Sequence, residues 1–170
     1  MIFAGVYAIT VPAAISAAVT VSAVNQNVVD TVAAHQSITI NDSTASGAGW
    51  HVTASATTFT SGANTLANVG TFAVTGSLTS MTATTAPTAT CVTTCTLPGN
   101  TTVYPVAITT APSSPVASVI WHAPVSTGLG AVTLGGSAAA HPLGWWVNIP
   151  ITTLVGTYTS TVTLSVVSGP

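Results

Sequence analysis

The sequence predicts an all-β protein, an antiparallel β-sandwich of the Ig-like or jelly-roll-like kind, and two observations carry this prediction. Apolar residues alternate with Thr or Ser along many short runs, and a period of two is typical of half-buried strands. Gly, Pro, Asn and Asp gather between these runs, where they favour turns. Many short strands separated by frequent turns indicate an antiparallel sandwich.

The individual strands follow from the same alternation. The stretch GWHVTASATTFTSGANTL, which begins at Gly49, reads as a strand, a turn and a second strand. No stretch has a helical period with caps except residues 13–35, where a helix is an alternative. The expected strands are residues 19–22, 37–40, 50–53, 71–75, 103–108, 131–134, 145–151 and 157–167.

The length of 170 residues suits a single domain with an extension. We expect residues 1–12 to form an N-terminal extension and residues 13–170 to form the sandwich, with a Thr-rich insert around residues 79–102. The extension carries an apolar strand that could pair with another copy, and the alternative is an ordinary first strand. Its candidate subunit-contact residues are Ile2, Phe3, Val6, Tyr7, Ile9 and Val11.

Charge is almost absent from this chain. It has no Lys or Arg and two acidic residues, so 1% of its residues are charged, against roughly 25% in an ordinary soluble domain. Nucleic-acid binding, which depends on Lys and Arg, is therefore excluded, and so is an isopeptide staple built on lysine. Asp30 and Asp42 are the only carboxylate pair available for glycoside hydrolysis. We expect no enzyme activity and no cofactor.

Low charge instead favours self-association. Edge strands are usually protected by charged side chains, and net charge keeps proteins apart in solution. This chain has almost no charged side chains to protect its edge strands and a net charge of only −2, so we expect a homopolymer. The apolar N-terminal stretch contains Pro12 and several Thr and Ser residues, which make it a poor membrane span, and we expect no membrane in the mature assembly.

Cys91 and Cys95 stand four residues apart in a Thr-rich connector. With no His nearby, a zinc site would lack ligands. The preferred interpretation is a small-loop disulfide, which implies an oxidising, extracellular location.

Two stretches carry a resemblance to a known family. INDSTASGAGWHVTASATTFTSGANTL and the C-terminal LVGTYTSTVTLSVVSGP resemble parts of WxL-type bacterial cell-surface domains. The family's C-terminal Trp-x-Leu stands here as Leu164-Ser165-Val166, and only Trp50-His51-Val52 keeps the aromatic form. The resemblance implies a β-sandwich displayed at the cell surface, in this case in a filament-forming relative, and cell-wall polysaccharide as a partner.

The titratable residues do not form a recognisable catalytic motif. His35, His51, His122 and His141 are scattered, and no G-x-S-x-G elbow occurs. Asp42 is expected to accept backbone N–H bonds in an Asx-turn, and Asp30 to end a strand. His51 and His122 each follow a Trp, so in a strand they point away from that Trp, toward solvent or a neighbouring molecule.

The tryptophans are expected to be anchors. Trp50 is predicted to anchor the core. Trp145 and Trp146 are adjacent and must point to opposite faces of a strand, so they are candidate subunit contacts. Asn41 and Asn100 begin N-x-S/T sequons at expected turns and are candidate glycosylation sites.

The function predicted from these observations is that of a structural subunit in an extracellular filament or surface layer, polymerising non-covalently by β-strand donation. One alternative is a monomeric module that binds cell-wall glycans through exposed Trp side chains. The other is a pilin-like subunit in which residues 13–35 form a core helix.

Overall fold

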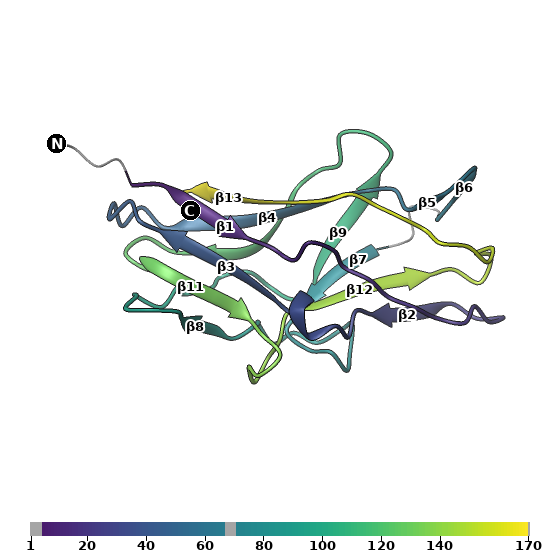
Figure 1. The fold of residues 1–170 in the computed structure, drawn as a ribbon, viewed down its shortest axis with the longest axis horizontal. Helices are drawn as coiled ribbons and strands as arrows, with labels where there is room; N and C mark the ends of the chain where they lie inside the picture. The colour runs from purple at the N-terminus through teal and green to yellow at the C-terminus, as the bar shows by residue number, and fades with distance from the viewer. Residues whose placement is uncertain (1–4, 67–70, 170) are drawn as a thin grey trace.

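The computed structural model describes residues 5–66 and 71–169, and it confirms the all-β sandwich (Figure 1). The first sheet is antiparallel and has the order β1-β3-β11-β8. Its strands are β1 (Tyr7–Thr10), β3 (Ser37–Asp42), β11 (Gly130–Gly135) and β8 (Ala89–Cys91).

The second sheet has the order β10-β4-β9-β7-β12-β2, and β13 lies along the other side of β4. Only β4 and β9 run parallel among its described pairs. A separate two-stranded hairpin, β5 (Thr60–Ser61) and β6 (Asn64–Thr65), projects from the body (Figure 1). The strands of the second sheet are β2 (Gln26–Val29), β4 (Trp50–Thr57), β7 (Thr71–Thr75), β9 (Val106–Ala111), β10 (Ser118–Ala123), β12 (Gly144–Ile149) and β13 (Val162–Ser168).

The core lies between the two sheets and follows the alternation. In β4, Trp50, Val52, Ala54 and Ala56 are buried, while the residues between them are partly exposed. The first sheet contributes every second residue of β3 and β11 to the core, since side chains of successive residues point to opposite faces. These facing residues are Ile38, Ile40, Val132 and Leu134.

The N-terminal strand is part of this sandwich. Residues 7–10 pair with β3 of the same chain, from Tyr7 opposite Asp42 to Thr10 opposite Thr39. Tyr7 and Ile9 pack against the core, so within one chain the strand behaves as an ordinary first strand at the edge of the first sheet. Ile2 and Phe3 lie outside the described residues.

The helix considered for residues 13–35 does not form, and the pilin-like alternative built on it is wrong. Residues 11–25 have no regular structure, and β2 follows them. The only helical turn in the described chain is the 3₁₀ turn Ala33–His35. No described helix has the length and apolar character needed to cross a membrane.

The expected strand at residues 19–22 is also absent. The side chain of Gln26 closes this segment into a loop, because it donates to the carbonyl of Thr20 and accepts from the N–H of Ser22. The strand expected from residue 103 begins only at Val106, just after Pro105, which has no N–H to donate.

Candidate functional site

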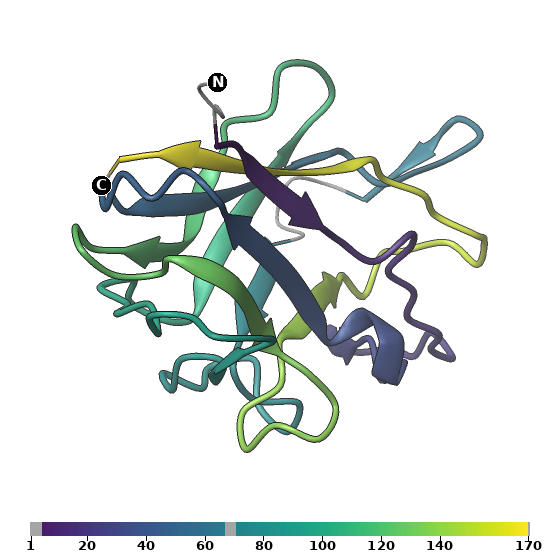
Figure 2. The ribbon, with the colours of Figure 1, turned by 60° about the vertical axis from the view of Figure 1, so that its left-hand side comes forward.

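Two edge strands lie side by side on the sandwich and offer a surface for pairing with another strand. β1 ends the first sheet and β13 ends the second, and among the described strands each pairs on one side only. The two strands are in contact, and the Ser168 hydroxyl lies 3.4 Å from the Tyr7 hydroxyl. In both ribbon views the first and last strands lie next to each other in the upper part of the molecule (Figures 1 and 2). An edge of this kind offers unpaired N–H and C=O groups to another strand.

The candidate contact residues of the N-terminal strand divide between its two faces. Tyr7 and Ile9 are half-buried against the core, whereas Val6 and Val11 are 62% and 41% exposed. The Ser43 side chain fixes the start of the strand, because its Oγ accepts from the N–H of Val6 and donates to the carbonyl of the same residue.

The surface of the folded chain carries no acidic side chain. Asp30 and Asp42, the only acidic residues, are 1% and 3% exposed. Because the chain also has no Lys or Arg, only histidines and the chain ends can place charge on the surface. Neither β1 nor β13 therefore has the charged protection usual for edge strands.

Asp30 ties three segments together from a buried position. Its Oδ2 accepts from the N–H of Ser16 at 2.7 Å and lies 2.6 Å from Nδ1 of His35. Its Oδ1 accepts from the N–H of Val32 at 2.8 Å. The backbone of Asp30 also donates to the carbonyl of Trp145. Asp30 follows the last residue of β2, so the prediction of a strand-end residue is confirmed.

Asp42 forms the predicted Asx-turn. Its Oδ1 accepts from both the N–H and the hydroxyl of Thr44, at 2.9 and 2.6 Å. The hydrogen-bond partners of the two carboxylates differ, since Asp30 contacts Ser16, Val32 and His35 whereas Asp42 contacts Thr44. Nowhere in residues 5–66 and 71–169 do three or more His, Cys, Asp or Glu side chains gather.

All four tryptophans are covered by their own chain. Trp50 is completely buried, as predicted, and its Nε1 donates to the carbonyl of Gly128 at 2.9 Å. Trp145 and Trp146 are 1% and 7% exposed, so the prediction that they contact another subunit is wrong. They do point to opposite faces, but the loop after β7 covers Trp146, whose Nε1 donates to the carbonyl of Ser77.

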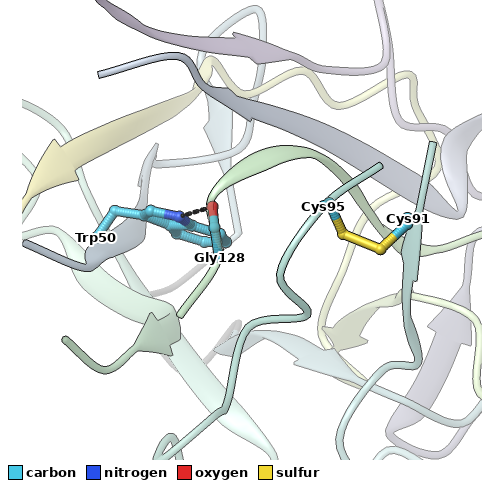
Figure 3. The surroundings of a disulfide bond; sticks show 4 residues. All are labelled: Trp50, Cys91, Cys95 and Gly128. Carbon is cyan, nitrogen blue, oxygen red and sulfur yellow. Dashed lines mark hydrogen bonds between the residues drawn. A yellow bond between two sulfur atoms is a disulfide. The ribbon is translucent and has the colours of Figure 1, made fainter. Parts of the chain in front are cut away.

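Cys91 and Cys95 form the predicted disulfide. Figure 3 shows the disulfide together with Gly128, whose carbonyl accepts the hydrogen bond from Trp50. The disulfide loop extends the β8–β11 ladder, because Val92 and Thr96 donate to the carbonyls of Ala131 and Leu129. The cross-link therefore holds the loop against the turn whose Gly128 carbonyl fixes the core tryptophan.

The two sequon asparagines do not lie in free turns. Asn41 is an exposed residue inside β3, flanked by β1 and β11. The Asn100 side chain is already engaged, because its amide donates to the Tyr104 hydroxyl and its oxygen accepts from the N–H of Thr102 and His122. A glycan on Asn100 would disrupt these bonds, so the structure argues against this site.

Tyr104 makes stability depend on pH in the alkaline range. Burial raises its pKa to about 12, while an unfolded tyrosine titrates near 10. Between these values the unfolded chain loses this proton first, so we expect the free energy of unfolding to fall as pH rises from about 10 to about 12. Denaturant unfolding at several pH values checks this.

Tyr104→Phe is the control for this prediction. It should lower stability at neutral pH, because the hydroxyl donates to the carbonyl of Ile120, but it should flatten the alkaline slope. Tyr7 acts in the opposite sense, because the Ser168 hydroxyl lowers its pKa, so the comparison of the two proteins isolates Tyr104. An identical slope in both proteins would contradict the prediction.

His51 and His122 come together on the outer face of the second sheet. They are directly opposite each other in the β4–β10 ladder and line a hollow of about 410 Å³ with Thr101, Thr102 and Val119. Both point away from the neighbouring core tryptophans, as predicted. Their proximity depends on the register of two distant strands and on a bulge in β10 between Val119 and Trp121, so neither residue alone predicts it.

Comparison with known proteins does not assign this chain to a family. No family model matches it, and neither a curated protein nor a solved structure does. The resemblance to WxL-type domains therefore stays a prediction.

Proposed function

We propose that this chain is the structural subunit of an extracellular filament or surface layer, whose copies polymerise without covalent bonds by donating the N-terminal strand. In the polymer, β1 of one copy would pair with β3 of the next, in the register it has within one chain. The same ladder and the same core contacts would form between copies, as in other cases of strand exchange.

The position of β1 carries this proposal. It is a terminal edge strand, and its contact with the core comes from Tyr7 and Ile9. Residues 11–14 separate it from the first anchors of the following segment, Ile15, which packs against the core, and Ser16, whose N–H donates to Asp30. A short hinge next to a terminal strand favours exchange between neighbours, because the strand can leave without disturbing the rest of the sandwich.

The uncharged surface supports the same proposal. Like charges that would keep copies apart are absent from the exposed side chains of this protein, apart from histidine. Exposed apolar side chains also occur in the β12–β13 connection and in the segment before β2, which are joined by the bond from the N–H of Ile151 to the side chain of Asn25 and lie at the end of the long axis away from the N-terminus (Figure 1). Val24, Ile151, Leu154 and Val155 in these segments are each at least 54% exposed.

The disulfide supports an extracellular location, since such bonds persist mainly in oxidising compartments. The alternative of a monomeric glycan-binding module loses its basis, because all four tryptophans are buried and cannot stack on sugars. Polysaccharide of the cell wall as a partner stays a prediction.

Strand donation can be tested with two variants that each carry one cysteine in addition to the Cys91–Cys95 disulfide. Ala8 and Asn41 are opposite each other in the β1–β3 ladder and both are exposed. One preparation carries Ala8→Cys and the other carries Asn41→Cys with an isotope label, and the two are unfolded, mixed, refolded and oxidised. Because Cα atoms of directly opposite residues lie within about 4.5–5.5 Å, a disulfide between them is geometrically allowed.

We expect mixed dimers, identified by intact mass, because donation places the new thiol at position 8 of one chain opposite the new thiol at position 41 of another. Intact mass is needed because the chain has no Lys or Arg for trypsin. The matched control replaces Ala8→Cys by Thr10→Cys, which stands opposite Thr39 instead, and should give far fewer mixed dimers. Equal yields from the two pairs would refute donation in this register.

A further inference from the structure

The His51–His122 pair has the arrangement of a metal-binding site. Directly opposite residues share one face of a sheet, with Cβ atoms about 4.5–5.5 Å apart, so both imidazoles can reach one ion. Both rings line the hollow of about 410 Å³ on the outer face. The two histidines belong to β4 and β10, so they are not part of β1, the proposed assembly strand.

The hydrogen bonds of His51 orient its ring for a ligand. Its Nδ1 lies 2.9 Å from the carbonyl oxygen of Gly169. A carbonyl only accepts, so Nδ1 carries the hydrogen and the neutral ring keeps its lone pair on Nε2. A bond from one ring nitrogen to a backbone carbonyl is the usual outer-shell support of a metal-binding histidine. Gly169 is itself held, since its N–H donates to the carbonyl of Gly49.

His122 has a buried nitrogen without a partner. Its Nδ1 lies 2.5 Å from the Thr101 hydroxyl, while its Nε2 is buried and has no hydrogen-bond partner among the described residues. A buried polar atom in this state normally costs about 1–3 kcal/mol. A metal ion bound at Nε2 would remove that cost, while the bond between Nδ1 and Thr101 would hold the ring in place.

We propose that Nε2 of His51 and Nε2 of His122 together bind a divalent transition-metal ion, with Cu²⁺ bound most tightly. Neutral imidazoles suit Cu²⁺, Ni²⁺ and Zn²⁺, and Cu²⁺ has the highest affinity in this series. Ca²⁺ and Mg²⁺ do not fit, because they require several oxygen ligands such as carboxylates, and the residues lining the hollow include none. Water completes the coordination, with the Thr101 and Thr102 hydroxyls beside it.

The test is a Cu²⁺ titration of the full chain, followed by calorimetry and electron paramagnetic resonance. The native protein should bind one tight equivalent whose spectrum shows coupling to two equatorial nitrogens. Loss of even an outer-shell partner typically weakens metal binding 10–100-fold, so we expect His51→Gln and His122→Gln each to weaken binding on the order of 100-fold. Circular dichroism shows that both variants are folded.

His141→Gln is the matched control, because His141 is exposed and lies outside the hollow. It should leave the affinity and the two-nitrogen spectrum unchanged. The proposal is overturned if either His51→Gln or His122→Gln binds Cu²⁺ as tightly as the native chain, or if His141→Gln weakens binding equally. None of these outcomes depends on whether the chain polymerises.

Discussion

Deletion of residues 1–11 is expected to abolish polymers of this protein. The deletion removes β1 and uncovers the edge of β3 that β1 pairs with. It also removes Tyr7 and Ile9 from the core surface formed in part by Ile38 and Ile40. The truncated chain could accept a strand but could not donate one, so it could not extend a filament. Sedimentation velocity and negative-stain electron microscopy measure the result.

Rescue by a peptide separates strand loss from misfolding. A peptide of residues 5–11 should bind the truncated chain, raise its melting temperature and leave it monomeric, because the slot beside β3 is then filled without a covalent link. Matched single variants refine the test. Ile9→Asp places a charge on the core-facing side and should block assembly, whereas Thr10→Asp lies on the exposed side of the same strand. Unchanged filaments after the deletion would exclude β1 as the donor.

Asp30→Ala is expected to lower the free energy of unfolding by about 2–6 kcal/mol. The carboxylate accepts from the backbone N–H of Ser16 and Val32 and contacts His35 from a buried position. Its removal leaves two backbone donors unpaired, and each such loss costs about 1–3 kcal/mol. Urea denaturation measures the change.

Asp42→Ala is the natural control, because Asp42 is the only other acidic residue of the chain. Its side chain bonds within one turn, to Thr44, so we expect a loss of about 1 kcal/mol, similar to the loss of a helix cap. If both substitutions lowered the free energy of unfolding equally, the claim that Asp30 connects separate segments of the chain would be contradicted. Release of Ser16 would also lengthen the hinge that follows β1, so Asp30→Ala should speed the exchange of strands between copies.

Local alternation correctly predicted the strands that pair with a neighbouring strand and bury one face in the core. The segments around Ile38, Val52, Val74 and Val132 are of this kind, because one face of each strand is buried. Alternation at residues 19–22 was misleading, since Val19 is 39% exposed and the Gln26 side chain takes the place of a strand partner. A period of two therefore does not by itself ensure pairing.

Contacts between distant segments account for the errors in the predicted site. The opposite orientations of Trp145 and Trp146 followed from their adjacency, but the cover of Trp146 comes from Ser77, far away in the sequence. Asn100 looked like a free sequon because one of its partners, the N–H of His122, is brought to it by tertiary structure. The His51–His122 pair was hidden for the same reason.

Negative-stain electron microscopy of the concentrated full-length chain tests strand donation most directly. Filaments or an ordered layer, which disappear on deletion of residues 1–11, are the predicted result. A stable monomer at high concentration, with no assembly after unfolding and refolding, would contradict the proposed function.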